Sequence, residues 1–250
     1  MTHLSPGATW QRPKAAEWFL DERQTRLPMI DVSEDVIKRL FERHGQAVER
    51  FLDLGAGDGA LSELMLALFP HAEAVLVDFS EPMLAGVEQR LAGRGRWRVV
   101  RGDLSDPRWR RQLPEGSYGA VVSSLAIHHL PTERKRNLFA EVFELLEAGA
   151  MFVNLDYVAI DGPLHGLWDE QLVANALRLE RERGGSRSAA ELERELLDDA
   201  DEDRPDTVED QLRWLRDAGF EGVEVHFKWA EAAVFGGVRP RLASARGERE

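Results

Sequence analysis

The chain has 250 residues, of which 43% are hydrophobic and 31% charged, an ordinary globular composition that suits one large α/β domain. Its net charge of −13 argues against a protein that grips nucleic acid phosphates over a broad surface. The absence of cysteine excludes disulfides, thiolate metal sites and a cysteine nucleophile. Apolar runs fall short of the ~18–20 residues of a membrane span, and the first residues lack a secretory pattern. We therefore expect a cytoplasmic protein without a membrane partner.

The first two segments of the chain differ in their predicted secondary structure. Residues 1–48 form a predicted N-terminal helical lid segment, with a helix over 33–44 whose N-cap is Ser33. From 49 to 158, a predicted cofactor-binding core alternates short β-rich runs with amphipathic helical patterns. The strands are predicted over 50–54, 73–78, 97–103, 118–124 and 151–157, and the helices over 60–69, 81–91 and 132–146. Because the runs are apolar at successive positions, they predict a doubly wound, mostly parallel sheet covered on both faces.

The remainder of the chain adds helices and a hairpin. Residues 159–205 are rich in Leu, Glu, Arg and Asp, and predict two inserted helices broken at the GGS of 184–186. Residues 206–238 carry a last helix, ended by Gly219, and two apolar runs joined by a short turn. Runs joined this tightly pair antiparallel. We expect seven strands in all, and a disordered tail over 239–250.

The stretch FLDLGAGDGA, residues 51–60, places a glycine-rich turn at the carboxyl end of the first predicted strand. Open parallel sheets bind ligands at such ends. Gly55, Gly57 and Ala60 satisfy the dinucleotide pattern G-x-G-x-x-A. Asp78 follows at about the distance in sequence, roughly 20 residues, at which an acid binds the ribose hydroxyls of a dinucleotide. However, the carboxylates of Asp53, before the turn, and of Asp58, within it, repel a pyrophosphate and favour a positively charged ligand.

Several motifs in order resemble the class I S-adenosylmethionine-dependent methyltransferases. DLGAGDG at 53–59 resembles their first motif, Asp78 ends the second strand in VLVDFSEPML, and Asp103 follows in VVRGDLSD at the same interval. VVSSLAIHHL at 121–130 ends the fourth strand, and the closing hairpin also fits the family. The resemblance covers roughly residues 51–237, and it implies methyl transfer from S-adenosylmethionine with S-adenosylhomocysteine as the product.

The resemblance also implies roles for individual residues. Asp53 and the backbone of the first turn hold the amino and carboxylate groups of the methionine part, and Asp78 accepts from both ribose hydroxyls. Phe79 and Met83 flank the adenine, and Asp103 with the Leu104 amide binds its polar edge. The implied cofactor residues are Asp53, Gly55, Ala56, Gly57, Asp78, Phe79, Met83, Asp103, Leu104, Ser123 and Ser124.

Catalysis on an activated methyl donor consists mainly of alignment, and a general base is needed only if the acceptor must lose a proton. Candidate catalytic residues follow the fourth and fifth strands: His128, His129, Asp156 and Tyr157. The histidine pair is also explained by packing and capping at the next helix, and Asp156 by a structural hydrogen bond. No set of residues indicates a metal site.

Acceptor pockets in the family are roofed by the N-terminal segment and by the insertion after the fifth strand. The residues that these parts and the hairpin offer here are Trp10, Trp18, Phe19, Met29, Trp168, Trp214 and Lys228. An apolar lid over an acidic cofactor site favours a small organic acceptor, methylated on oxygen or nitrogen before carbon. Three alternatives stay open: an RNA-base-modifying enzyme with the same cofactor, an NAD-dependent oxidoreductase, and a non-catalytic scaffold. A homodimer is also open.

Overall fold

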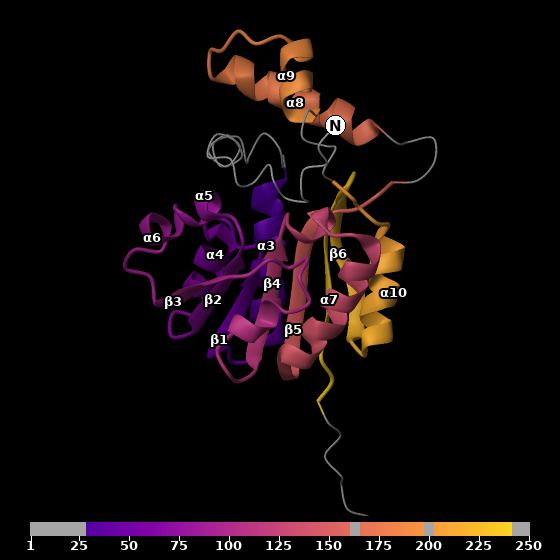
Figure 1. Ribbon diagram of the computed structural model, residues 1–250. Coiled ribbons are helices and arrows are strands. Elements are labelled where there is room, and N and C mark those ends of the chain that lie inside the picture. Colours follow the sequence, from indigo (N-terminus) through magenta and orange to yellow (C-terminus); the bar gives the residue numbers. More distant parts are fainter. Residues whose placement is uncertain (1–28, 161–165, 198–202, 242–250) are drawn as a thin grey trace, which may run out of the picture.

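The computed structural model describes residues 29–160, 166–197 and 203–241, and its centre is one seven-stranded sheet (Figure 1). The strands are β1 (Arg50–Leu54), β2 (Glu73–Asp78), β3 (Arg96–Arg101), β4 (Tyr118–Ser124), β5 (Leu146–Tyr157), β6 (Glu221–Trp229) and β7 (Ala232–Val238). Their spatial order is β3-β2-β1-β4-β5-β7-β6. The first five pair in parallel, and β7 pairs antiparallel with β5 and β6. The predicted fold class is confirmed.

Helices cover both faces of this sheet (Figure 1). One face carries α3 (Ile30–His44), α4 (Ala60–Leu68), α5 (Glu81–Leu84) and α6 (Val87–Arg90), and the other carries α7 (Thr132–Leu145) and α10 (Val208–Ala218). Two short 3-10 helices, η2 (Trp109–Gln112) and η3 (Ile127–His129), lie in the connections. Alternate strand residues point to opposite faces, so each strand contributes to two cores. Phe51 packs with Met65 of α4, whereas Leu52 belongs to the same core as Phe139 of α7.

The insertion after β5 forms two helices, α8 (Leu167–Glu182) and α9 (Ala189–Leu197), beyond the end of the sheet toward which β5 runs (Figure 1). The break between them lies at the predicted glycines. Glu180 stabilises this break by accepting from the Arg187 backbone N–H at 3.0 Å and from its guanidinium Nη2 at 2.7 Å. Among the described residues, no helix is both long and apolar enough to cross a membrane.

Two predicted helices differ from the structure. The helix predicted over 33–44 is α3, which begins at Ile30, so Ser33 lies inside it rather than at its N-cap. The short hydroxyl of Ser33 donates back to the Met29 carbonyl at 2.9 Å, which fits the first turn as well as a cap does. The helix predicted over 81–91 is split into α5 and α6 beside Gly86. A Cβ on Gly86 would lie 3.1 Å from the Cβ of Asp58, so the break brings this segment against the glycine turn.

The edges of two strands also differ. β3 ends at Arg101, so Asp103 lies in the loop that follows, and β5 starts at Leu146, ahead of the predicted Met151. A register shift between Tyr118 and Ala120 of β4 accommodates the early part of β5. Residues 1–28 of the predicted lid segment (1–48) and residues 242–250 of the predicted tail (239–250) lie outside the described residues. The proposed domain boundaries stay predictions.

We expect Phe152→Ala to lower the free energy of unfolding by about 3–5 kcal/mol, because Phe152 is fully buried between β5 and the α7–α10 layer. Val99→Ala on the edge strand β3, where the side chain is 37% exposed, should cost less than about 1 kcal/mol. Chemical denaturation measures both values. Equal losses would contradict the assignment of the core.

Candidate active site

The turn between β1 and α4 requires glycine at three alternate positions. Gly55, Gly57 and Gly59 have φ values of 66°, 55° and 85°, in the left-handed region that side chains disfavour. The backbone N–H groups of Gly55 and Ala56 both donate to the Val77 carbonyl, at 2.8 and 3.1 Å. These bonds continue the β1–β2 pairing into the turn, so the turn is tied to the end of β2.

A second contact fixes the turn from the side of β4. A Cβ on Gly55 would lie 2.1 Å from the Cβ of Ala126, which follows β4. Leu125, which connects the end of β4 to Ala126, has a φ of 53°, and its N–H donates to the Leu155 carbonyl at 2.8 Å. The ends of β1, β2, β4 and β5 are therefore locked together around one turn.

Two buried acids lie at the carboxyl ends of β1 and β2. Asp78 accepts from the Gly57 N–H at 2.9 Å and from the Ser80 N–H at 2.8 Å, one bond to each carboxylate oxygen. Burial raises the pKa of Asp78, and these backbone donors oppose the shift. Asp53 is 1% exposed and accepts from the Ser62 hydroxyl at 2.6 Å. Because a carboxylate has about four acceptor sites, Asp78 keeps capacity for further donors.

Asp58 differs from these acids because its charge is compensated within the protein. Its Oδ2 accepts from the Arg90 guanidinium, with Nε at 2.9 Å, and Arg90 also reaches Glu63 at 3.1 Å. The turn therefore carries less uncompensated negative charge than the sequence indicates. Repulsion of an anionic ligand rests on Asp53 and Asp78, both buried, and not on Asp58.

These groups line one cavity at the carboxyl ends of the strands, with about 1070 Å³ of empty space, part of it open to solvent. Every predicted cofactor residue except Ser123 lines it, and Asp58, Ala126 and His129 line it too. Ser123 is fully buried, and its hydroxyl donates to the Leu54 carbonyl at 2.7 Å. Asp103 is exposed, and it accepts from the Ser105 N–H at 2.8 Å. Phe79, Met83 and Leu104 give the cavity apolar surface.

The candidate catalytic residues form a second polar group beside this cavity. Asp156 is fully buried, and it accepts from the backbone N–H of His128 at 2.9 Å and from that of Tyr157 at 3.1 Å. Its Oδ1 lies 2.5 Å from His128 Nδ1. The His128 and His129 rings are 3.9 Å apart between centroids, and the Tyr157 ring stands edge-on to His128 at 5.0 Å. Of these four residues, His129 lines the cavity.

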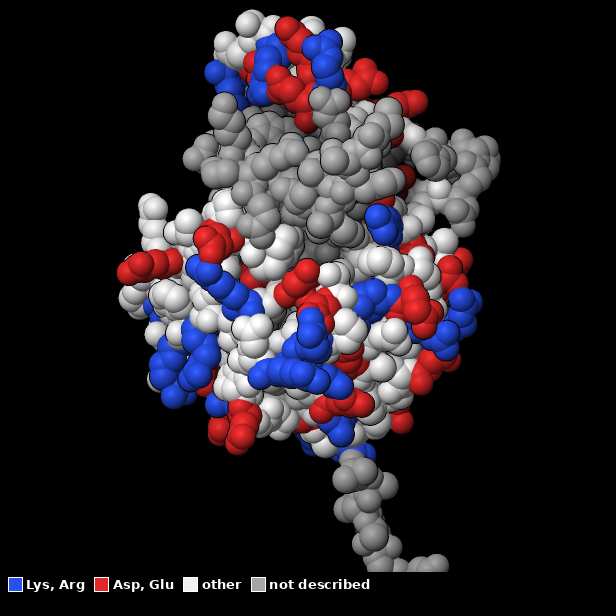
Figure 2. Space-filling view, in the orientation of Figure 1, with Lys and Arg blue, Asp and Glu red and all other residues white. Residues whose placement is uncertain are grey.

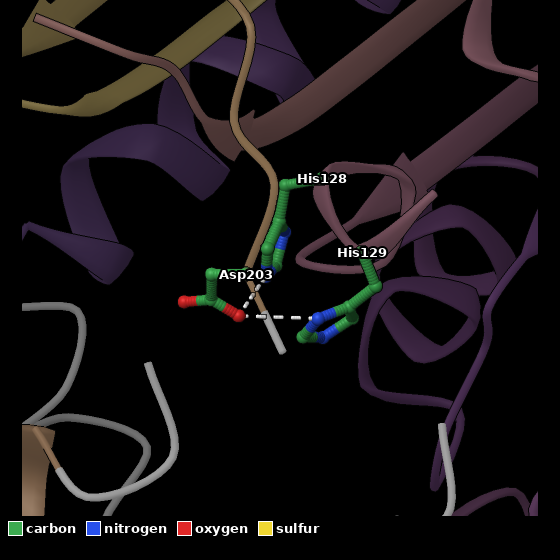
Figure 3. A group of neighbouring side chains, drawn as sticks. All are labelled: His128, His129 and Asp203. Carbon is green, nitrogen blue, oxygen red and sulfur yellow. Dashed lines mark ion pairs between the residues drawn. The ribbon is translucent and has the colours of Figure 1, made fainter. Parts of the chain in front are cut away.

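Both imidazoles face a third residue, Asp203, which the sequence analysis did not single out (Figure 3). Asp203 Oδ1 lies 3.4 Å from His128 Nε2 and 3.1 Å from His129 Nδ1. We call His128, His129 and Asp203 the histidine cluster. Asp203 lies in the acid-rich run DDADEDRPD at 198–206, where no spacing distinguishes one acid from the next. Only the return of the chain from the insertion to the sheet brings it to the histidines.

The charges of this group shift the pKa values of its members in opposite directions. Burial alone lowers the pKa of His128, but the charge and hydrogen bond of Asp156, together with Asp203, raise it to about 9. Burial and the neighbouring His128 lower the pKa of His129. Burial opposes ionisation of Asp203, yet the hydrogen bonds from both histidines lower its pKa. Asp156 and Asp203 therefore favour a positive charge at the position of His128.

The predicted acceptor residues are only partly described. Met29 is half-buried just before α3, and Lys228 is exposed, with its Nζ donating to the Ala230 carbonyl. Trp168 lies in α8, and its side chain is outside the described part, as are Trp10, Trp18 and Phe19. Trp214 belongs to the core between α7 and α10, with its ring 6.5 Å from that of Phe139, and does not line the cavity.

A doubly wound sheet with a glycine turn after β1 and an acid at the end of β2 defines a protein that binds a nucleoside-containing cofactor. The methyltransferase domain family matches residues 51–149. A demethylmenaquinone methyltransferase of Clavibacter sepedonicus is 33% identical over 181 residues, which cover 71% of this chain and 68% of that protein. The chain belongs to the class I S-adenosylmethionine-dependent methyltransferase family.

Solved structures agree on the fold. An O-methyltransferase family protein from Burkholderia thailandensis superposes with a TM-score of 0.61 at 18% identity, covering 91% of this chain and 60% of that one. Human N-acetylserotonin methyltransferase in complex with S-adenosylmethionine also superposes with a TM-score of 0.61, at 14% identity, covering 94% of this chain and 59% of that one. The chain thus spans about three fifths of the length of these two structures.

S-adenosylmethionine is the cofactor of this methyltransferase, and the cavity fits it. The cavity combines glycine backbone without side chains, two buried carboxylates and apolar walls. A ligand with an ammonium group, a sulfonium, ribose hydroxyls and an adenine ring needs those three features together.

We expect Gly55→Ala to cost more free energy of unfolding than Gly45→Ala, although both positions have similar φ values of 66° and 70°. A Cβ at Gly45 meets nothing within 4 Å, so only the left-handed backbone is penalised, by about 1–2 kcal/mol. A Cβ at Gly55 displaces the turn from Ala126. S-adenosylmethionine affinity, measured by calorimetry, should then fall by at least about tenfold in Gly55→Ala alone. Equal affinity in the two variants would show that the contact does not shape the cavity.

Proposed function

We propose that the protein transfers the methyl group of S-adenosylmethionine to an oxygen or nitrogen atom, less favourably carbon, of a small organic molecule. The observation that carries the proposal is one cavity that joins the predicted cofactor residues to His129. A polar side chain thus borders the cofactor site at its edge. The four candidate catalytic residues lie together there, in a buried network with Asp203.

The lining residues divide between the parts of the cofactor. Asp78, held by two backbone donors, accepts from the ribose hydroxyls, and Asp53 accepts from the amino group of the methionine part. Phe79, Met83 and Leu104 pack on the adenine, and Asp103 binds its polar edge. Gly55, Ala56 and Gly57 supply backbone that approaches the cofactor closely, and Ser124 lines the methionine end.

S-adenosylmethionine supplies a methyl group that is already activated by the sulfonium. The protein must then align the acceptor and exclude water, and alignment can contribute as much as ~7–11 kcal/mol of barrier lowering. His129 borders the cavity, while the buried Asp156 orients His128 behind it. We assign the acceptor side of the site to this edge, with Met29, Trp168 and Lys228 as further candidates for acceptor contacts, together with Trp10, Trp18 and Phe19.

The names of related proteins support a small acceptor. The relative from Clavibacter sepedonicus is named for demethylmenaquinone, and the human structure for N-acetylserotonin. The apolar walls of the cavity suit an organic acceptor with apolar surface.

Electrostatics favours this acceptor class over RNA. The net charge is −13, and on the face shown in Figure 2 the blue and red side chains of the described residues are intermingled. Many arginines of the described residues are paired, as Arg90 with Asp58 and Arg98 with Glu73. Paired cations release few counterions from a phosphate backbone, so they add little to nucleic acid affinity.

We expect calorimetric titration to give binding heat with S-adenosylmethionine and S-adenosylhomocysteine, and none with NAD. Asp78→Ala should weaken S-adenosylmethionine binding by about 2–3 kcal/mol, the scale of hydrogen bonds to a charged group. Asp106→Asn is the matched control, because Asp106 lies in the next loop and pairs with Arg108. Unchanged affinity in Asp78→Ala would remove the ribose assignment, and binding of NAD would favour an oxidoreductase.

We expect methyl-labelled cofactor to label small molecules that carry hydroxyl or amino groups, with release of S-adenosylhomocysteine. A metabolite extract and total RNA, offered separately, distinguish the acceptor classes. Label in RNA alone would overturn the small-molecule proposal. Cofactor binding without product release across a broad acceptor panel would point to a scaffold.

A further inference from the structure

We propose that the histidine cluster binds a divalent first-row transition ion. His128 Nε2, His129 Nδ1 and Asp203 Oδ1 all lie within 4.8 Å of one another, and their side chains converge on one point (Figure 3). Two imidazoles and one carboxylate are the ligands that zinc, iron and their neighbours use when coordination positions stay open.

The spacing of the ligand atoms fits a shared ion. Asp203 Oδ1 lies 3.1 Å from His129 Nδ1 and 3.4 Å from His128 Nε2. Around an ion with bonds of about 2.1 Å, neighbouring ligand atoms are ~3.0–3.4 Å apart in octahedral and tetrahedral geometry. The two pairs that include Asp203 already have this spacing.

The buried Asp156 orients one of the proposed ligands, His128. Asp156 lies 2.5 Å from His128 Nδ1 and also accepts from the His128 backbone N–H. A proton on Nδ1 leaves the lone pair of Nε2 pointing toward Asp203. Histidines that bind metals donate their other ring N–H to a carboxylate in this way, which fixes the ring and raises its basicity.

The charge balance also favours a dication. With both imidazoles neutral, Asp156 and Asp203 bring two negative charges into a buried region. Lys135, a buried cation that donates to the Arg204 carbonyl, is already paired with Asp206 at 2.7 Å. A proton on His128 compensates one of the two charges, whereas a divalent ion compensates both.

The position of Asp203 is fixed by hydrogen bonds of the residues that follow it. The Arg204 N–H donates to the His128 carbonyl at 3.1 Å, and Lys135 Nζ donates to the Arg204 carbonyl. Asp206 accepts at its carbonyl from the Ala159 N–H at 3.0 Å, and Thr207 caps α10. These bonds fix the backbone that follows Asp203, so the site is preorganised.

The position of His129 gives the ion a role in the reaction, and this role rests on the proposed function. Three protein ligands leave coordination positions open, and His129 also lines the cofactor cavity. An ion there lowers the pKa of a hydroxyl of the acceptor, which favours oxygen over nitrogen. The hydroxyl proton passes to solvent, the oxygen forms its bond to the methyl carbon, and the carbon–sulfur bond breaks with its electron pair on sulfur.

Titration of the untagged, chelator-treated full chain with Co²⁺ tests the site through visible absorption and calorimetry. We expect one ion per chain, displaced by Zn²⁺. His129→Ala and Asp203→Asn should each weaken binding by at least about 100-fold, and Asp156→Asn by ~10–100-fold. His71→Ala is the control, since His71 is exposed and its side chain lies outside the cluster.

Absence of Co²⁺ binding, or equal binding in the wild type and in both His129→Ala and Asp203→Asn, would overturn the site. Calorimetry of Asp203→Asn with S-adenosylmethionine separates this proposal from the proposed function, because we expect that variant to keep cofactor affinity while losing the ion. Once an acceptor is known, addition of Zn²⁺ should raise kcat in the wild type and not in Asp203→Asn. An unchanged kcat would overturn the role in acceptor activation.

Discussion

Close backbone contact at the glycine turn is the constraint on which the site depends. Gly55 lies against Ala126 so closely that a Cβ there would be 2.1 Å away, and its N–H continues the β1–β2 pairing through Val77. The ends of four strands meet at this point. Because packed backbone has few alternative arrangements, the turn transmits the geometry of the sheet directly to the cofactor cavity. The cavity is therefore a property of the sheet and not of a free loop.

Buried charge is managed differently on the two sides of that turn. Asp58 is neutralised by Arg90 within the protein, whereas Asp53 and Asp78 keep hydrogen-bond donors from Ser62 and from the backbone. A carboxylate that accepts from neutral donors stays available to a ligand, and one paired with arginine does not. The local electrostatic sign is consequently set by two acids at adjacent strand ends.

The histidine cluster extends this acidic edge across the end of the sheet. It joins η3, the end of β5 through Asp156, and the segment that precedes α10. The insertion of α8 and α9 lies between these parts in sequence, so its length determines where Asp203 returns to the sheet. This arrangement links the acceptor side of the site to the insertion, the part of the fold in which we expect acceptor contacts to lie.

The class of fold and most residues of the cofactor cavity could be predicted from the pattern of amino acids alone. Apolar runs that alternate with helices specify a parallel sheet, and three alternate glycines with acids at strand ends specify what lies at its edge. These signals are local, since each depends on a few consecutive residues. Three contacts became visible only in the folded protein: Arg90 neutralises Asp58, the Ser123 hydroxyl donates to the buried Leu54 carbonyl, and Asp203 lies against the histidine pair. Those contacts join residues far apart in the chain, and an acid in a charged run carries no sign of its partner until packing brings the two together.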